Sequence, residues 1–163
     1  MKRLLLDTNI YGRMMLDSSL LSIEKAIRDK VIIHGFKVIR EELRNTPQKV
    51  KIGSKSLRIE LLHIYDHVIS KSYDLTLETE RLCEDYFITY KELGGAFGVN
   101  EMRNDFLIVA CATIHEMDII VSEDSRSLLS EDALKAYSIV NALYKRKNPA
   151  FIKYLEFKRW LFE

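Results

Sequence analysis

Apolar and polar positions along the chain alternate in two ways, and each predicts a different element. Short apolar runs rich in leucine or β-branched residues are typical of buried parallel strands, whereas apolar residues that recur every three or four positions are typical of amphipathic helices. The first pattern predicts strands at residues 3–6, 31–33, 118–122 and 137–140. The second predicts helices at residues 11–29 (in two pieces), 37–43, 56–69, 75–93 and 106–116.

Strands separated by helices predict one α/β domain over residues 1–163, a three-layer α/β/α fold with a central parallel sheet of short strands. The helices at 56–69 and 75–93 follow one another and are expected to form a hairpin, at 56–93, that flanks the sheet or is inserted beside it. Gly35 is expected to mark a turn after the second strand. Pro149 is expected to open a last, aromatic helix at 149–162, which packs into the core or forms a dimer surface.

Composition narrows the class of protein only a little. The 163 residues are 47% hydrophobic and 30% charged, and the formal net charge of +1 argues neither for nor against a nucleic-acid partner. Cys83 and Cys111 lie in apolar helical patterns without metal-ligand spacing, so both are expected to be buried, reduced thiols. The opening MKRLLLD has too short an apolar run for a signal peptide or a membrane span, so a cytoplasmic protein is expected.

Acidic residues follow two of the expected strands. Asp7 comes directly after the first strand and Asp124 lies just beyond the strand at 118–122, while Asp105 precedes the apolar helix and is expected in its first turn. The carboxyl ends of parallel strands share one edge of the sheet, which is where α/β proteins bind ligands. Asp7 could instead only cap the first helix. Because Asp105 and Asp124 are expected at the same edge, a site is the better interpretation.

A fourth acid is expected to reach the same edge from the helix at 37–43. Val38, Ile39 and Leu43 face the core at helical spacing, so Glu42 is expected at the cleft and Glu41 in solvent. Four gathered carboxylates repel one another unless a cation neutralises them. Oxygen ligands without His or Cys favour Mg²⁺ or Mn²⁺. His63 and His67 have metal-ligand spacing but no third ligand nearby, and are expected to be ordinary histidines.

Between the helices at 37–43 and 56–69 lies a basic segment without a single acid, RNTPQKVKIGSKSLR. Pro47 and Gly53 indicate a loop or a helix–loop–helix crossing. Its five cations could hold the phosphates of an RNA, or could simply be solvated, and the sequence favours neither. They are Arg44, Lys49, Lys51, Lys55 and Arg58.

Four stretches give the chain a family resemblance. They are LLLDTN at 4–9, EEL at 41–43, NDFLIVACA at 104–112 and IIVSED at 119–124. In these stretches the chain resembles the PIN-domain nucleases, and among them the VapC-like toxin ribonucleases. The first and third stretches are fairly specific as a pair, whereas EEL alone is weak.

The resemblance implies a Mg²⁺- or Mn²⁺-dependent endoribonuclease with a toxin role in a toxin–antitoxin pair. It implies an RNA substrate, an antitoxin partner and a homodimer. The implied metal ligands are Asp7, Glu42, Asp105 and Asp124, and the implied supporting groups are Thr8, Asn9 and Ser122.

Other function classes fit less well or remain open. A phosphatase with an Asp nucleophile needs a second Asp two positions later, where this chain has Asn9. A phosphoacceptor signalling domain needs paired acids after the first strand, which LLLDTN lacks. The open alternative is a PIN-like module that binds RNA or a protein without cutting, because the presence of acids does not demonstrate catalysis.

Overall fold

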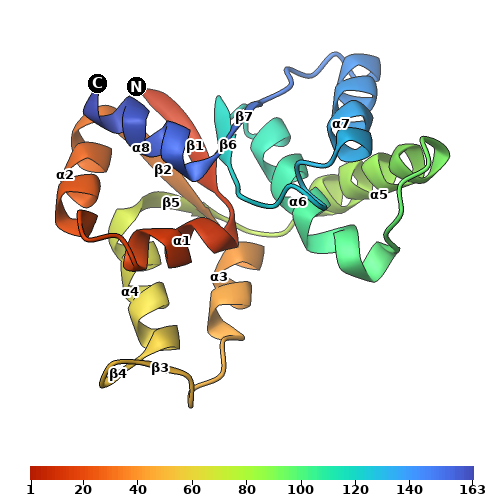
Figure 1. Ribbon diagram of the computed structural model, residues 1–163. Coiled ribbons are helices and arrows are strands. Elements are labelled where there is room, and N and C mark those ends of the chain that lie inside the picture. Colours follow the sequence, from red (N-terminus) through yellow and green to blue (C-terminus); the bar gives the residue numbers. More distant parts are fainter.

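The computed structural model describes residues 1–163 and is built around a sheet of five parallel strands in the order β5-β2-β1-β6-β7 (Figure 1). A separate antiparallel pair, β3 with β4, lies at the end of a projecting arm. The strands are β1 (Lys2–Leu6), β2 (Val31–Phe36), β3 (Lys51–Ile52), β4 (Lys55–Ser56), β5 (Ile69–Tyr73), β6 (Ile119–Val121) and β7 (Ala150–Ile152).

Helices cover both faces of the sheet, which confirms the predicted PIN-like three-layer α/β/α arrangement. In Figure 1, α1, α2, α4 and α8 lie on one side, α5, α6 and α7 lie on the other, and α3 contacts both groups. The helices are α1 (Thr8–Met15), α2 (Leu20–Lys30), α3 (Lys37–Arg44), α4 (Leu57–Val68), α5 (Leu77–Glu92), α6 (Val99–Ile114), α7 (Glu131–Leu143) and α8 (Tyr154–Phe162). None of them is long and apolar enough to cross a bilayer.

The core forms around β1 and α6. Leu4, Leu5 and Leu6 are fully buried because β1 is the middle strand and helices cover both of its faces. The segment of α6 from Phe106 to Thr113 is buried all round, since the helix packs on the sheet and on α5. Burying an apolar side chain of this size stabilises the fold by about 1.5–3 kcal/mol.

Three sequence predictions about secondary structure are wrong. The helices of the expected hairpin at 56–93 are separated by the edge strand β5. The middle of β5, Ser70 to Ser72, is polar and exposed, so the segment lacks the apolar pattern from which strands were predicted. Residues 137–140 belong to α7, where Ser130 caps the helix and buried residues recur at helical spacing. The segment after Pro149 first forms β7, and the last helix, α8, begins only at Tyr154.

Two loop predictions also change. Gly35 lies inside β2 and makes no turn; a Cβ there would lie 2.4 Å from the hydroxyl oxygen of Tyr65, so the strand needs glycine for close packing. The basic segment connects α3 to α4, as a helix–loop–helix crossing would, but its middle also forms the β3–β4 hairpin around Gly53, whose φ of +61° suits glycine.

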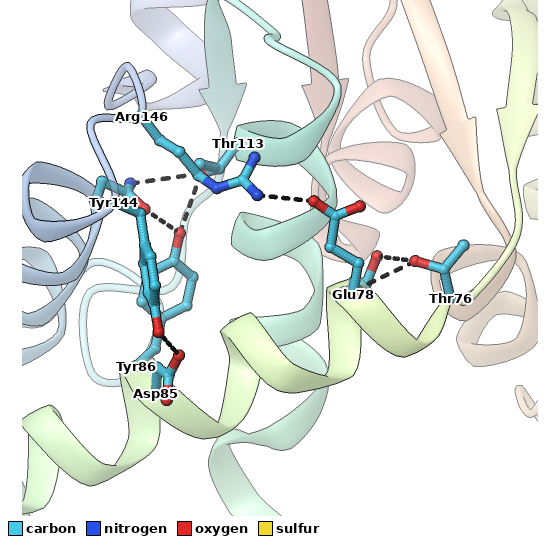
Figure 2. A network of polar contacts seen from close by, with 9 residues as sticks. Thr76, Glu78, Asp85, Tyr86, Thr113, Tyr144 and Arg146 are labelled. Carbon is cyan, nitrogen blue, oxygen red and sulfur yellow. Dashed lines mark hydrogen bonds and ion pairs between the residues drawn. The ribbon is translucent and has the colours of Figure 1, made fainter.

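A buried polar network joins α5, α6 and α7 (Figure 2). The Tyr86 hydroxyl lies 2.6 Å from Asn141 Oδ1 on α7 and 3.1 Å from Thr113 Oγ1 on α6. At its exposed rim Tyr144 donates to Asp85 and Arg146 pairs with Glu78. Nearby, the predictions for both cysteines are confirmed: Cys83 and Cys111 are buried and unpaired.

Candidate active site

The site begins where β1 ends. Asp7 is the N-cap of α1, and its Oδ1 accepts a hydrogen bond of 2.8 Å from the Thr8 backbone N–H. Its Oδ2 accepts one of 2.7 Å from the hydroxyl of Ser122, which directly follows β6. Asp7 therefore caps α1 through one carboxylate oxygen and links α1 to the end of β6 through the other. Only 4% of Asp7 is exposed.

The second acid comes from α3, as helical spacing predicted. Glu42 is half-buried and its Oε1 accepts a hydrogen bond of 2.9 Å from Thr8 Oγ1, whereas Glu41 is exposed. Thr8 thus contacts both acids, Asp7 through its backbone and Glu42 through its side chain. The Asn104 side chain, on α6, lies near Glu42 and lowers the pKa of that acid a little, against the rise from burial.

The third and fourth acids meet at one hydroxyl. Ser127 Oγ lies within hydrogen-bond distance of Asp105 Oδ2 on α6 and of Asp124 Oδ2 in the loop after β6. The backbone N–H of Ser127 donates to Asp124 Oδ1 at 3.1 Å. Contrary to prediction, α6 begins at Val99, so Asp105 lies in its second turn and lacks the full benefit of the helix's positive end.

The loop that carries Asp124 is tied down by three neighbours. Ser122 Oγ accepts from the Asp124 backbone N–H at 3.1 Å while donating to Asp7. Asn9 Oδ1 accepts from the Glu123 backbone N–H at 3.3 Å, and the Glu123 carboxylate pairs with Arg13. Asn9 therefore positions this loop in the structure.

Burial raises the pKa of three of the acids, Asp7, Glu42 and Asp105. Burial raises the pKa of Asp7, against the lowering effect of the hydrogen bonds from Ser122 and Thr8, and Asp124 adds repulsion. Burial also raises the pKa of Glu42, with Asp7 adding to it.

The pKa of the third acid, Asp105, is raised as well. Burial raises its pKa from 3.8 to about 7, and the charges of Asp7, Asp124 and Glu42 add to the rise. The four carboxylates are thus electrostatically coupled, as the sequence predicted. Near neutral pH a nearby cation would favour their charged forms.

The donor set suits a hard divalent cation. The four acids and the hydroxyls between them supply oxygen alone, and oxygen ligands favour Mg²⁺ or Mn²⁺. Three hydroxyls, from Thr8, Ser122 and Ser127, hold the acids in this arrangement. No three His, Cys, Asp or Glu side chains are drawn together as closely as metal ligands. His67 is paired with Glu24.

The basic residues extend from the same helix that carries Glu42. They lie on the arm formed by the end of α3, the β3–β4 hairpin and the start of α4, which projects from the body of the molecule (Figure 1). Arg44, Lys49, Lys51 and Lys55 are exposed, and Arg58 is half-buried. Glu41, Arg44, Asn45 and Arg58 line a hollow of about 370 Å³ on this arm.

Sequence reasoning missed two residues of the site. Asn104 stands directly before Asp105, and only the contact of α3 with α6 brings its side chain to Glu42. Ser127 had a weak local signal, because a serine three residues after an Asp can satisfy its carboxylate in a turn. Its second contact, with Asp105, is long-range and depends on the fold.

Comparisons with known proteins bear on the fold. No family model matches the sequence, and no curated protein matches it. One chain of the crystal structure of VapBC2 from Rickettsia felis, bound to a DNA fragment from its promoter, matches with a TM-score of 0.62 at 15% identity, over 93% of this chain and 98% of that one. One chain of FitAB bound to the IR36 DNA fragment matches with a TM-score of 0.58 at 14% identity, over 92% and 94%. At these identities the similarity establishes the fold.

Proposed function

We propose that the protein is a metal-dependent endoribonuclease that hydrolyses RNA phosphodiester bonds. The observation that carries the proposal is the gathering of four coupled carboxylates, from four separate elements or loops, at the carboxyl edge of a parallel sheet. Such an arrangement raises the pKa of buried acids and contributes no evident stability. Costly clusters of titratable groups at a ligand-binding edge are characteristic of functional sites.

Asp7, Glu42, Asp105 and Asp124 are the proposed ligands of Mg²⁺ or Mn²⁺. When bound, the ion would neutralise the carboxylates, lower the pKa of an attacking water and stabilise negative charge on the phosphate. Thr8 and Ser122 orient Glu42 and Asp7 through the hydrogen bonds described above.

The basic arm is the proposed path of the RNA backbone. It begins at Arg44, two residues beyond Glu42, so phosphates held on the arm lead towards the acids. Lysine and arginine contacts to phosphate position a nucleic acid without reading its sequence. The overall charge of the chain contributes little to RNA binding, because its net charge is only +1.

The fold similarity supports a more specific role. Because VapBC2 and FitAB share this fold, we propose that the chain is the toxin of a toxin–antitoxin pair and forms a homodimer. The expected antitoxin is a small basic or amphipathic protein that covers the acidic cleft. A neighbouring reading frame for such a protein should encode an inhibitor of cleavage. The expected dimer should have twice the 19.1 kDa mass of the chain in light scattering.

The test is cleavage of a mixed pool of structured and single-stranded RNAs by purified protein, with Mg²⁺, Mn²⁺ or chelator. Asp105→Asn is expected to abolish cleavage, and Glu92→Gln is the control because Glu92 is an exposed acid on α5, outside the site and the basic arm. Cleavage that needs both the metal and Asp105 supports the proposal. Equal cleavage by wild type and Asp105→Asn would indicate a contaminating nuclease and count against it.

One observation favours a second candidate, a non-catalytic module that binds RNA or protein. The acids are held by hydroxyl groups and do not converge as metal ligands do. Calorimetric titration with Mg²⁺ and Mn²⁺ separates the candidates. A saturable site that Asp105→Asn weakens supports the nuclease, whereas the absence of both metal binding and cleavage supports the module.

A further inference from the structure

A hollow of about 320 Å³ opens directly beside the acids, and the proposed hydrolysis does not use it. Its wall includes Asp124 and Ser127, which belong to the acidic site, and three residues that do not: Phe97, Glu101 and Arg126. Its volume lies within the range of small-ligand sites, about 300–1,000 Å³.

The three further residues come from two segments, the start of α6 before Asp105 and the loop that carries Asp124. Glu101 stands four residues before Asp105 on α6, so the two carboxylates share one face of the helix, one turn apart. Arg126 follows Asp124 by two residues, and its backbone N–H donates to Asp124 Oδ1 at 3.2 Å. A ligand in the hollow therefore lies next to the proposed metal ligands.

Phe97 is held in place before any ligand arrives. Its backbone N–H donates to the Tyr90 hydroxyl at 3.1 Å, and Lys91 Nζ lies 2.8 Å from the Gly95 carbonyl and 3.3 Å from that of Phe97. A Cβ at Gly95 would lie 2.3 Å from the Tyr90 ring, so the loop is packed tightly against α5. The backbone that carries Phe97 is thus held in place, and its side chain is partly buried against the core, so little order has to be created on binding.

The charged groups of the hollow are free to meet a ligand. Glu101 and Arg126 are both exposed, and neither takes part in any ion pair of the structure. The hollow therefore combines an aromatic face, a carboxylate and a guanidinium. That combination matches an unstacked nucleobase, which single-stranded RNA offers to proteins.

The pattern of donors and acceptors selects one base. A carboxylate accepts two parallel hydrogen bonds only where two donors stand side by side, as the N1–H and N2 amino groups of guanine do. Adenine and cytosine place an acceptor beside their amino group, and uracil has a single donor between two carbonyls. Arginine in turn pairs with O6 and N7 of guanine.

We propose that this hollow binds a guanine of the RNA substrate next to the scissile bond, stacked on Phe97 and read by Glu101 and Arg126. The inference rests on the proposed function for bringing RNA to this edge of the sheet. It assigns a base preference to the enzyme, which the acids and the basic arm cannot provide because they contact only the backbone.

The test measures binding separately from cleavage. The full chain carrying Asp105→Asn is titrated, at fixed salt, into fluorescein-labelled decauridine strands with one central guanosine, adenosine or inosine. Fluorescence anisotropy gives Kd. The guanosine strand is expected to bind at least about tenfold tighter than the adenosine strand, since one good bidentate contact alone gives about that preference and the proposal has two. Inosine, which lacks the N2 amine, should fall between them.

Adding Glu101→Gln is expected to lower the guanosine-to-adenosine ratio several-fold, because only the contact of Arg126 then distinguishes the two bases. Glu92→Gln is the matched control, because Glu92 is an exposed glutamate on α5 and its change removes the same charge. Adding Phe97→Leu should weaken binding of the guanosine strand several-fold, because leucine offers no aromatic face for stacking. Circular dichroism of each variant verifies its fold.

The outcomes separate this inference from the proposed function. Guanosine preference that depends on Glu101 supports the hollow, even if the wild type cleaves no RNA. Metal-dependent cleavage together with equal binding of all three strands would refute guanine binding in the hollow and would still support the proposed nuclease function. A preference that Glu101→Gln and Glu92→Gln change equally would also refute guanine binding in the hollow, because it would reflect overall charge.

Discussion

Removing the charge of Asp105 should stabilise the metal-free protein while it abolishes the proposed activity. In the structure the pKa of Asp105 rises from 3.8 to about 7, chiefly through burial and then through repulsion by Asp7, Asp124 and Glu42. In Asp105→Asn the amide oxygen can still accept the hydrogen bond from Ser127. The substitution therefore removes the cost of the buried charge and keeps the hydrogen bond.

The sign and size of the change in the free energy of unfolding follow from proton linkage. The folded protein binds the Asp105 proton more tightly than the unfolded chain does. The resulting stabilisation is fully present below pH 3.8 and is lost as the pH rises through about 7. A shift of about three pKa units corresponds to an upper limit of ~4 kcal/mol above pH 7, at 1.36 kcal/mol a unit. Asp105→Asn should thus gain little near pH 4 and about 2–4 kcal/mol at pH 8.

Urea denaturation in chelator, at intervals from pH 4 to pH 8, measures this difference. Glu41→Gln, on the exposed neighbour of Glu42, is expected to change the free energy of unfolding little at any pH. Saturating Mg²⁺ should reduce the difference in stability between Asp105→Asn and wild type, because the ion stabilises the wild type, which keeps the proposed metal site. A difference between Asp105→Asn and wild type that is independent of pH, or a loss of stability at pH 8, would refute the electrostatic account of the site.

Three further changes test the fold and the arm. Gly35→Ala should cost about 1–3 kcal/mol in urea denaturation, because its Cβ would lie 2.4 Å from the Tyr65 hydroxyl oxygen; an unchanged midpoint would contradict the packing described. Tyr86→Phe should cost about 1–3 kcal/mol by leaving buried polar partners unpaired, and an unchanged thermal midpoint would argue against the network. Lys51→Ala with Lys55→Ala should reduce the salt dependence of RNA affinity. The slope of log affinity against log salt concentration should fall by roughly 0.7 for each phosphate that the arm no longer neutralises. An unchanged slope would show that the RNA does not bind along the arm.

Elements with strong, uniform patterns could be predicted from the sequence. The leucines of β1 and the apolar run of α6 have no other place than the interior, so the parallel sheet and its buried helix followed from local pattern alone. Weak patterns were interpreted wrongly. The ISKSY of β5 has too few apolar residues to indicate a strand, and it forms one only because β2 offers a free edge. The reverse error, at residues 137–140, arose because a β-branched pair outweighed the helical spacing around it.

The acidic site divides in the same way. The sequence alone predicted that Asp7, Glu42 and Asp124 lie near one edge, since parallel strands end together and a helix has a known period, and that Asp105 joins them. Only the tertiary structure decided how the acids are held, through Thr8, Ser122 and Ser127, and that Phe97, Glu101 and Arg126 line a hollow beside them. The physical reason is range: periodicity and strand order depend on neighbours in the chain, whereas a hydroxyl shared between Asp105 on α6 and Asp124 after β6 depends on how separate elements pack.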